Sequence, residues 1–139
     1  MRFRIAAIAL TLGLATGTAG AAPAPEGGNA YFVFFNWGAV DVSSDWSSNI
    51  DEAVAAYQAS PTGTLVRVTG YSDRSGPVDV NRRISERRAR AVAKVLIERG
   101  IPESAVHVSA SGEGESLILT EDGVREAQNR RVEIILEPQ

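Results

Sequence analysis

The chain has 139 residues, which is room for one ordinary domain, and it contains no cysteine, so its core must be stable without disulfides. Its 14 basic and 17 acidic residues give a net charge of −3, and this acidic balance argues against nucleic acid as a partner.

Residues 1–21 have the order of a secretory signal peptide. Arg2 and Arg4 precede an apolar run over 5–14, and small residues follow up to Ala21. The apolar run is too short for an ordinary membrane span. We therefore expect export to the periplasm and cleavage near Ala21. A cleaved product would have no membrane span and, without a cysteine to acylate, no lipid anchor, whereas a retained signal would anchor the chain in the inner membrane.

Residues 22–30 are rich in proline, glycine and alanine and are predicted to form a short linker, which leaves 31–139 as the domain. Strand and helix patterns alternate through this domain and predict an α+β fold, in which a mixed sheet of about four strands has two main helices packed on it. The expected elements, in chain order, are a strand over 31–35, a helix from 43–45 to just before Pro61, a strand over 64–69, a long helix from about 78 to 99, a strand over 105–110, a loop or short helix over 117–127, and a strand over 131–136.

The long helix carries two polar residues on its apolar face. At 100° per residue, Asn81 and Arg88 fall within the stripe formed by Ile84, Val92 and Val95. A guanidinium on the core side of a helix is costly unless it is paired. Its predicted partner is Asp73, in the turn after the second strand, and such a pair has either a purely structural role or a role in a binding site.

Several motifs in order give this chain a family resemblance. Gly70-Tyr71-Ser72-Asp73-Arg74-Ser75-Gly76 is followed by the run 81–89, by Gly112-Glu113-Gly114-Glu115-Ser116 and by the run 129–134. Together they resemble the OmpA-like C-terminal domain over about residues 31–136. The resemblance implies an OmpA-like βαβαβ-β sandwich in the periplasm, with association to the outer membrane or cell wall. It also implies non-covalent binding of peptidoglycan through the diaminopimelate of the stem peptide.

The resemblance also implies roles for particular residues. The Asp and Arg that bind the ligand in that family match Asp73 and Arg88, so the carboxylate would take the ammonium of diaminopimelate and the guanidinium its carboxylate. Asn81 would hold the Asp73 loop or touch the ligand. Further ligand contacts are expected from Ser72, Asn36 and Trp37, and supporting contacts from Asn129 and Arg131.

The sequence departs from the family pattern at three places that we expect at the rim of the pocket. Tyr71 stands where histidine is usual, and Asn36 and Gly38 replace the two acids of an Asp-x-Asp segment around Trp37. These changes keep a second function open, that of a periplasmic adaptor that contacts another envelope protein. The sequence predicts neither an enzyme nor a metal or cofactor site, because it offers no hydrolase motif and only one histidine, His107.

Overall fold

In the computed structural model, which describes residues 30–139, four strands form one mixed sheet. Their order is β1-β4-β2-β3, so β1 and β3 are the edges. β2 and β3 are parallel, as a helical crossover between them requires, and the other two pairings are antiparallel. The strands are β1 (Ala30–Phe34), β2 (Leu65–Tyr71), β3 (Val106–Gly112) and β4 (Arg131–Glu137).

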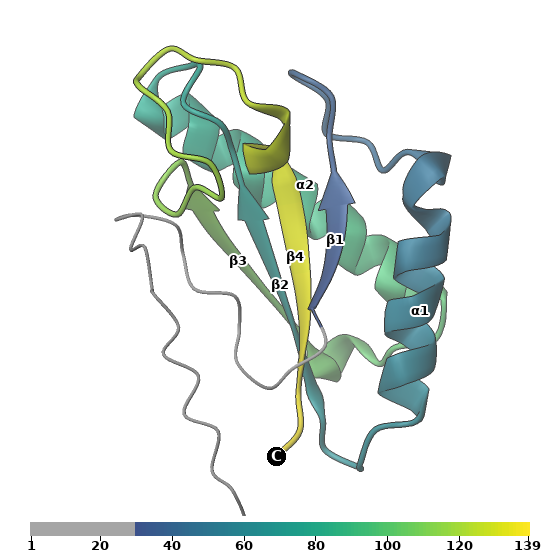
Figure 1. The fold of residues 1–139 in the computed structure, drawn as a ribbon. Coiled ribbons are helices and arrows are strands. Elements are labelled where there is room, and N and C mark those ends of the chain that lie inside the picture. The colour runs from purple at the N-terminus through teal and green to yellow at the C-terminus, as the bar shows by residue number, and fades with distance from the viewer. Residues whose placement is uncertain (1–29) are drawn as a thin grey trace, which may run out of the picture.

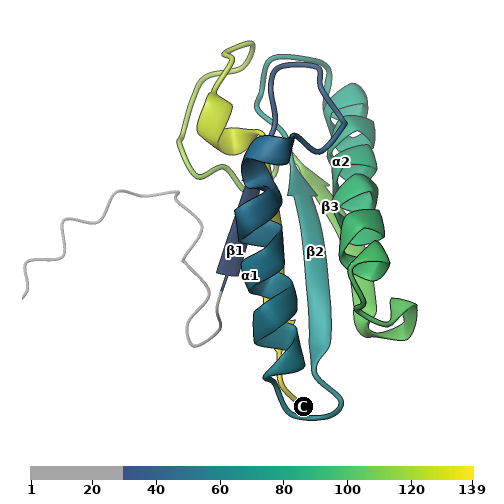
Figure 2. The ribbon, with the colours of Figure 1, turned by 90° about the vertical axis from the view of Figure 1, so that its right-hand side faces the viewer.

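Two long helices pack against this sheet (Figures 1 and 2). Helix α2 lies over β2 and β3, and α1 contacts β1. Gly100, just after α2, has a φ of +110°, the left-handed conformation that ends many helices. The helices are α1 (Ser47–Gln58) and α2 (Val78–Glu98), and single 3₁₀ turns are formed by η1 (Ser44–Trp46), η2 (Glu103–Ala105) and η3 (Ala127–Asn129).

The predicted fold class and element order are confirmed, and the differences are at element ends. Ala105 belongs to η2 rather than to the third strand, and β2 continues through Gly70 to Tyr71. Glycine was expected to end this strand, but pairing with β3 and β4 on both sides holds it in the sheet. The first strand begins at Ala30, the last residue of the predicted linker, while the predicted signal peptide and the rest of the linker lie outside the described residues.

The core lies between the helices and one face of the sheet. The buried face of α2 includes Asn81 and Arg88, as predicted. It is centred on Ser85, Ala89 and Val92, however, and the predicted stripe members Ile84 and Val95 are only half-buried at its edge. β2 and α2 approach closely at Gly70, where a Cβ would lie 1.9 Å from the backbone oxygen of Ser85. The core includes Val33, Ile50, Val66, Val68, Val92, Leu96, Ile101, Val132 and Ile134.

Three loops gather at one end of the sheet, where β1, β2 and β3 end and β4 begins (Figure 1). They span residues 35–43, 72–77 and 113–126. Backbone hydrogen bonds join the second loop to the end of β3, from Ser72 N to Gly112 O at 2.7 Å, and to the third loop, from Gly123 N to Arg74 O at 2.6 Å. The fold thus brings together segments that are far apart in the sequence.

Candidate functional site

A pocket of about 390 Å³ opens at this end of the sheet. Its walls combine one buried carboxylate, two guanidinium groups, an indole ring and the first turns of α2. The lining residues are Trp37, Gly38, Ser72, Asp73, Ser75, Gly76, Pro77, Val80, Asn81, Ile84, Arg88 and Arg130.

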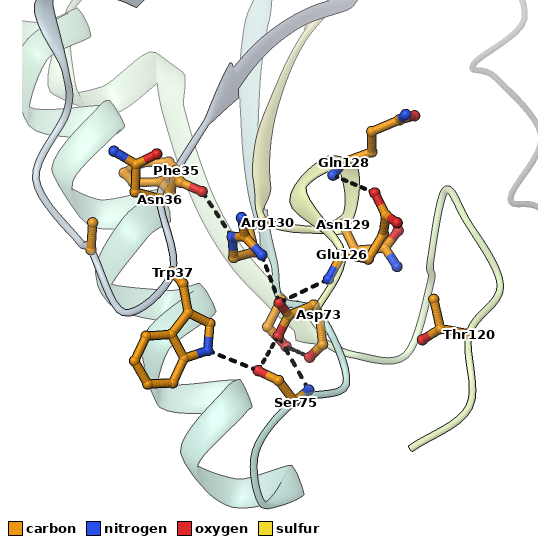
Figure 3. A network of polar contacts seen from close by, with 12 residues as sticks. Phe35, Asn36, Trp37, Asp73, Ser75, Thr120, Glu126, Gln128, Asn129 and Arg130 are labelled. Carbon is orange, nitrogen blue, oxygen red and sulfur yellow. Dashed lines mark hydrogen bonds and ion pairs between the residues drawn. The ribbon is translucent and has the colours of Figure 1, made fainter. Parts of the chain in front are cut away.

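Asp73 lies in the turn after β2 and is only 3% exposed. Each of its carboxylate oxygens accepts two hydrogen bonds (Figure 3). Oδ1 accepts from the backbone N–H and the hydroxyl of Ser75, at 3.2 and 2.6 Å. Oδ2 accepts from the backbone N–H of Glu126 at 3.2 Å and from Nη1 of Arg130 at 2.9 Å. The carboxylate is therefore fixed in position by three residues, one in its own loop and two in the segment before β4.

These contacts keep Asp73 ionised. Burial by itself would raise the pKa of this carboxyl group. The hydrogen bonds from Ser75, Arg130 and the Glu126 backbone outweigh that cost, and the pKa of Asp73 lies below its ordinary value of 3.8. The Asp73 carboxylate therefore carries its full negative charge at neutral pH.

Arg88 reaches the same pocket from the buried face of α2, and it is 2% exposed. Its Nε donates to the backbone oxygen of Ala39 at 2.8 Å and its Nη2 to that of Asn36 at 3.3 Å, while the ring of Phe35 lies 5.2 Å from its Cζ. The predicted Arg88–Asp73 ion pair is therefore wrong. Arg130 takes the place of Arg88 at Asp73, and the loop after β1 supplies carbonyl oxygens for Arg88 instead.

Two properties of Arg88 suit an anionic ligand. Among residues 30–139, its Nη1 makes no hydrogen bond, so one edge of the guanidinium keeps unused donors. Burial, together with the nearby positive charge of Arg130, lowers the pKa of Arg88 to about 10, which leaves it protonated at neutral pH. A carboxylate in the pocket would relieve both the missing hydrogen bond and the unfavourable charge.

Arg130 is the site residue that sequence reasoning missed. It bonds to Asp73 and also donates from Nε to the backbone oxygen of Phe35 at 3.0 Å, so it joins the loops after β1 and β2 (Figure 3). A sequence signal for it existed in the alternation of the following strand. Val132 and Ile134 face the core, so a period of two puts Arg130, and not Arg131, on their side of the sheet.

Asn81 and Ser72 hold the Asp73 loop in shape. Nδ2 of Asn81 donates to the backbone oxygen of Gly76 at 2.9 Å and to Oε2 of Glu113 at 2.8 Å. The hydroxyl of Ser72 donates to the backbone oxygen of Asp73 at 3.0 Å. Both residues line the pocket, so they are also within reach of a ligand.

Asn36 and Trp37 differ in their relation to the pocket. Trp37 lines it and donates from Nε1 to the hydroxyl of Ser75 at 3.1 Å. The side chain of Asn36 is exposed, and the residue lines a neighbouring pocket of about 370 Å³, so its link to the site is the carbonyl oxygen that holds Arg88. Gly38, the other departure in this segment, does line the pocket.

Asn129 and Arg131 support the third loop rather than the pocket wall. Asn129, in η3, exchanges two hydrogen bonds with the backbone of Ile118. Arg131 donates to Glu133 at 2.8 Å and to the backbone oxygen of Glu115 at 3.2 Å.

Tyr71 was expected at the pocket rim, and this prediction is wrong. Its ring lies 3.8 Å from Cζ of Arg131, and it does not line the pocket. Burial and the charges of Glu133 and Glu115 raise the pKa of Tyr71 to about 12, so it stays neutral on this other side of the sheet. The replacement of histidine by tyrosine therefore alters the support of the sheet and not the pocket.

Comparison with known proteins gives the class that this fold and site define. A sequence profile described as "OmpA family" matches residues 34–131, most of the described domain. The chain belongs to the OmpA family. It is 39% identical over 119 residues to an outer membrane protein of Gluconacetobacter diazotrophicus, covering 81% of this chain and 31% of that protein. It is 34% identical over 85 residues to a peptidoglycan-associated lipoprotein of Legionella pneumophila, covering 61% and 48%.

The structural comparison shows the same fold. The crystal structure of the peptidoglycan-associated lipoprotein from Burkholderia pseudomallei has a TM-score of 0.70 at 20% identity, covering 77% of this chain and 90% of the other. The chain spans less than half of the length of either sequence relative described above. By their names these relatives are proteins of the outer membrane or are associated with peptidoglycan. Over residues 30–139, neither helix is long and apolar enough to cross a bilayer.

Proposed function

We propose that this domain binds peptidoglycan without catalysis, by gripping the free end of diaminopimelate in the stem peptide. That end carries an ammonium and a carboxylate on one carbon. The observation that carries the proposal is the pocket itself, which holds an ionised carboxylate, Asp73, and a guanidinium with unused donors, Arg88. Asp73 takes the ammonium, and Arg88 takes the carboxylate.

The charge balance of the pocket favours a ligand with a carboxylate. Asp73 contributes one negative charge and is bonded to Arg130, so Arg88 is left as a positive charge without a carboxylate partner among the described residues. A zwitterionic ligand end supplies that partner, and its ammonium adds to the contacts of Asp73. An amine without a carboxylate would leave Arg88 buried and unpaired, which is costly.

The relatives support this proposal because one of them carries peptidoglycan association in its name. We place the domain in the periplasm, exported by the signal peptide predicted over residues 1–21, where it links an envelope component to the cell wall. Its partners are then the wall and, through its other surfaces, another envelope protein.

Sedimentation with isolated sacculi tests the function. The protein should pellet with sacculi, and Asp73→Asn and Arg88→Lys should stay in solution while keeping the wild-type circular dichroism spectrum. Arg88→Lys keeps the charge but loses the planar fork that bonds to two carbonyl oxygens and the ligand together. Arg90→Gln is the matched control, because Arg90 is an exposed arginine paired with Glu86 outside the pocket, and it should pellet like the wild type.

The opposite result identifies the alternative function. If the wild type stays in solution, or if the two pocket variants pellet as well as the control does, the proposal that Asp73 and Arg88 bind diaminopimelate is wrong. A periplasmic adaptor that uses this fold for protein contacts would then be the better account.

A further inference from the structure

A tryptophan and an arginine stack on each other beside the pocket. The Cζ atom of Arg125 lies 3.7 Å from the centre of the Trp37 ring. Trp37 is 56% exposed, although it is one of the largest apolar side chains in the domain. The exposed indole offers apolar surface at the edge of the pocket that it lines.

The stacked arginine has free hydrogen-bond donors. Among residues 30–139, the Arg125 guanidinium has no hydrogen bond and no ion pair, whereas Arg74, Arg83 and Arg90 each have a carboxylate partner. Stacking uses the face of a guanidinium and leaves its N–H edge available for a carboxylate. The indole also restricts the orientation of the guanidinium, which lowers the entropy cost of a contact.

Both members of the stack are tied to Asp73. Trp37 lines the pocket and donates to the Ser75 hydroxyl, which donates in turn to Oδ1 of Asp73 at 2.6 Å. Arg125 is followed directly by Glu126, whose backbone N–H bonds to Oδ2 at 3.2 Å. The stack is therefore held beside the carboxylate that is proposed to take the ligand ammonium.

We propose that Trp37 and Arg125 form a second carboxylate subsite at the edge of the pocket. This inference rests on the proposed function, and it specifies which chemical form of the stem peptide the domain binds best. With diaminopimelate in the pocket, the neighbouring stem residue is D-glutamate, which is linked through its side chain and keeps its α-carboxylate free. Arg125 binds that carboxylate. The domain then prefers stem peptides with a free glutamate carboxylate over those in which it is amidated.

Titration calorimetry with two tripeptides tests the subsite. One is L-Ala-γ-D-Glu-meso-diaminopimelate, and the other is the same peptide with the glutamate α-carboxylate amidated. The wild type should bind the free acid about two to five times more tightly than the amide, as expected for one exposed ion pair. This preference should shrink in high salt, which screens exposed charges.

Substitutions test whether the preference for the free-acid peptide comes from the stacked Trp37 and Arg125. Arg125→Gln should bind the two peptides equally, and Arg90→Gln, which removes one positive charge outside the pocket, should keep the wild-type preference. Trp37→Leu should lose the preference, whereas Trp37→Phe, which keeps a ring for stacking, should retain part of it.

Two results would contradict the subsite, and they differ in whether they also contradict the proposed function. If the wild type binds both peptides equally, or if Arg125→Gln keeps the preference, the proposed subsite is wrong, but binding of diaminopimelate by Asp73 and Arg88 is not contradicted. If the wild type binds neither peptide, both the proposed binding of diaminopimelate and the proposed subsite are wrong.

Discussion

Arg88 and Arg130 line the same pocket, but their surroundings suit them to different roles. Arg130 is bonded to the carboxylate of Asp73 and to the backbone of Phe35, so it fixes the site. Arg88 is bonded to two carbonyl oxygens, which orient it without neutralising it. A buried guanidinium that keeps its charge and has free donors is suited to receive an anion.

The helical period predicts from sequence that Arg88 and Asn81 face the core side of α2, and the structure confirms this placement. It could not predict which carboxylate or carbonyl each would meet. The cation that pairs with Asp73 is Arg130, and the carbonyl oxygens that hold Arg88 belong to residues 36 and 39. Only the folded chain decides among groups so far apart in sequence.

The ionised state of Asp73 predicts a loss of stability in acid. Its pKa in the folded protein lies below the value of 3.8 that it has when unfolded, so its contribution is present above about pH 3.8 and is lost as pH falls through the folded pKa. Near neutral pH, Asp73→Asn should lower the free energy of unfolding by about 2 kcal/mol, since Arg130 loses a buried partner.

Urea unfolding of the wild type and Asp73→Asn at several pH values measures this effect. The difference between the two proteins should be largest near neutral pH and should shrink in acid, where Asp73 itself becomes protonated. A difference that is constant from neutral pH to about pH 3 would contradict the depressed pKa.

At the scale of elements, the position of the site depends on how closely α2 lies on β2. Gly70 has no side chain, so the backbone of Ser85 can approach it, and the hydroxyl of Ser85 accepts a hydrogen bond from Gly112 N at 3.0 Å. This contact fixes α2, which carries Arg88, against the strand that leads into Asp73. The sequence did not predict this close approach at Gly70, because a glycine at the end of a strand is equally typical of a turn.

Gly70→Ala should therefore be strongly destabilising. The added Cβ would lie 1.9 Å from the oxygen and 2.7 Å from the carbonyl carbon of Ser85, and backbone atoms cannot move aside as a side chain can. We expect a loss of about 3 kcal/mol in the free energy of unfolding, measured in urea.

A substitution at an exposed position of the neighbouring strand is the control for this prediction. The side chain of His107 is exposed on β3. His107→Ala should therefore change the free energy of unfolding by no more than about 0.5 kcal/mol. If Gly70→Ala is as stable as this control, the close contact between α2 and β2 is not what sets the helix position.

At the scale of the whole molecule, the site is assembled from four separate segments at one end of the sheet. The loop after β1, the turn after β2, the first half of α2 and the segment before β4 each supply a wall or a hydrogen bond. The order of motifs predicted this gathering through the family resemblance. Composition and periodicity alone predicted the layers of the fold but not the end at which a ligand would bind.

The groups in the pocket suit the binding proposed above. They are an ionised carboxylate, two guanidinium groups and fixed hydrogen bonds, a set suited to opposite charges on a ligand. Its charged groups are held by several hydrogen bonds each, so the arrangement favours one geometry of a zwitterion.

The most direct test of this account is a calorimetric titration with two stem tripeptides that differ only in their third residue. One carries meso-diaminopimelate and the other L-lysine, which has the ammonium but lacks the carboxylate that Arg88 is proposed to bind. The account predicts saturable binding of the diaminopimelate peptide, at least about tenfold weaker binding of the lysine peptide, and no such difference in Arg88→Lys. Equal binding of the two peptides by the wild type would contradict it.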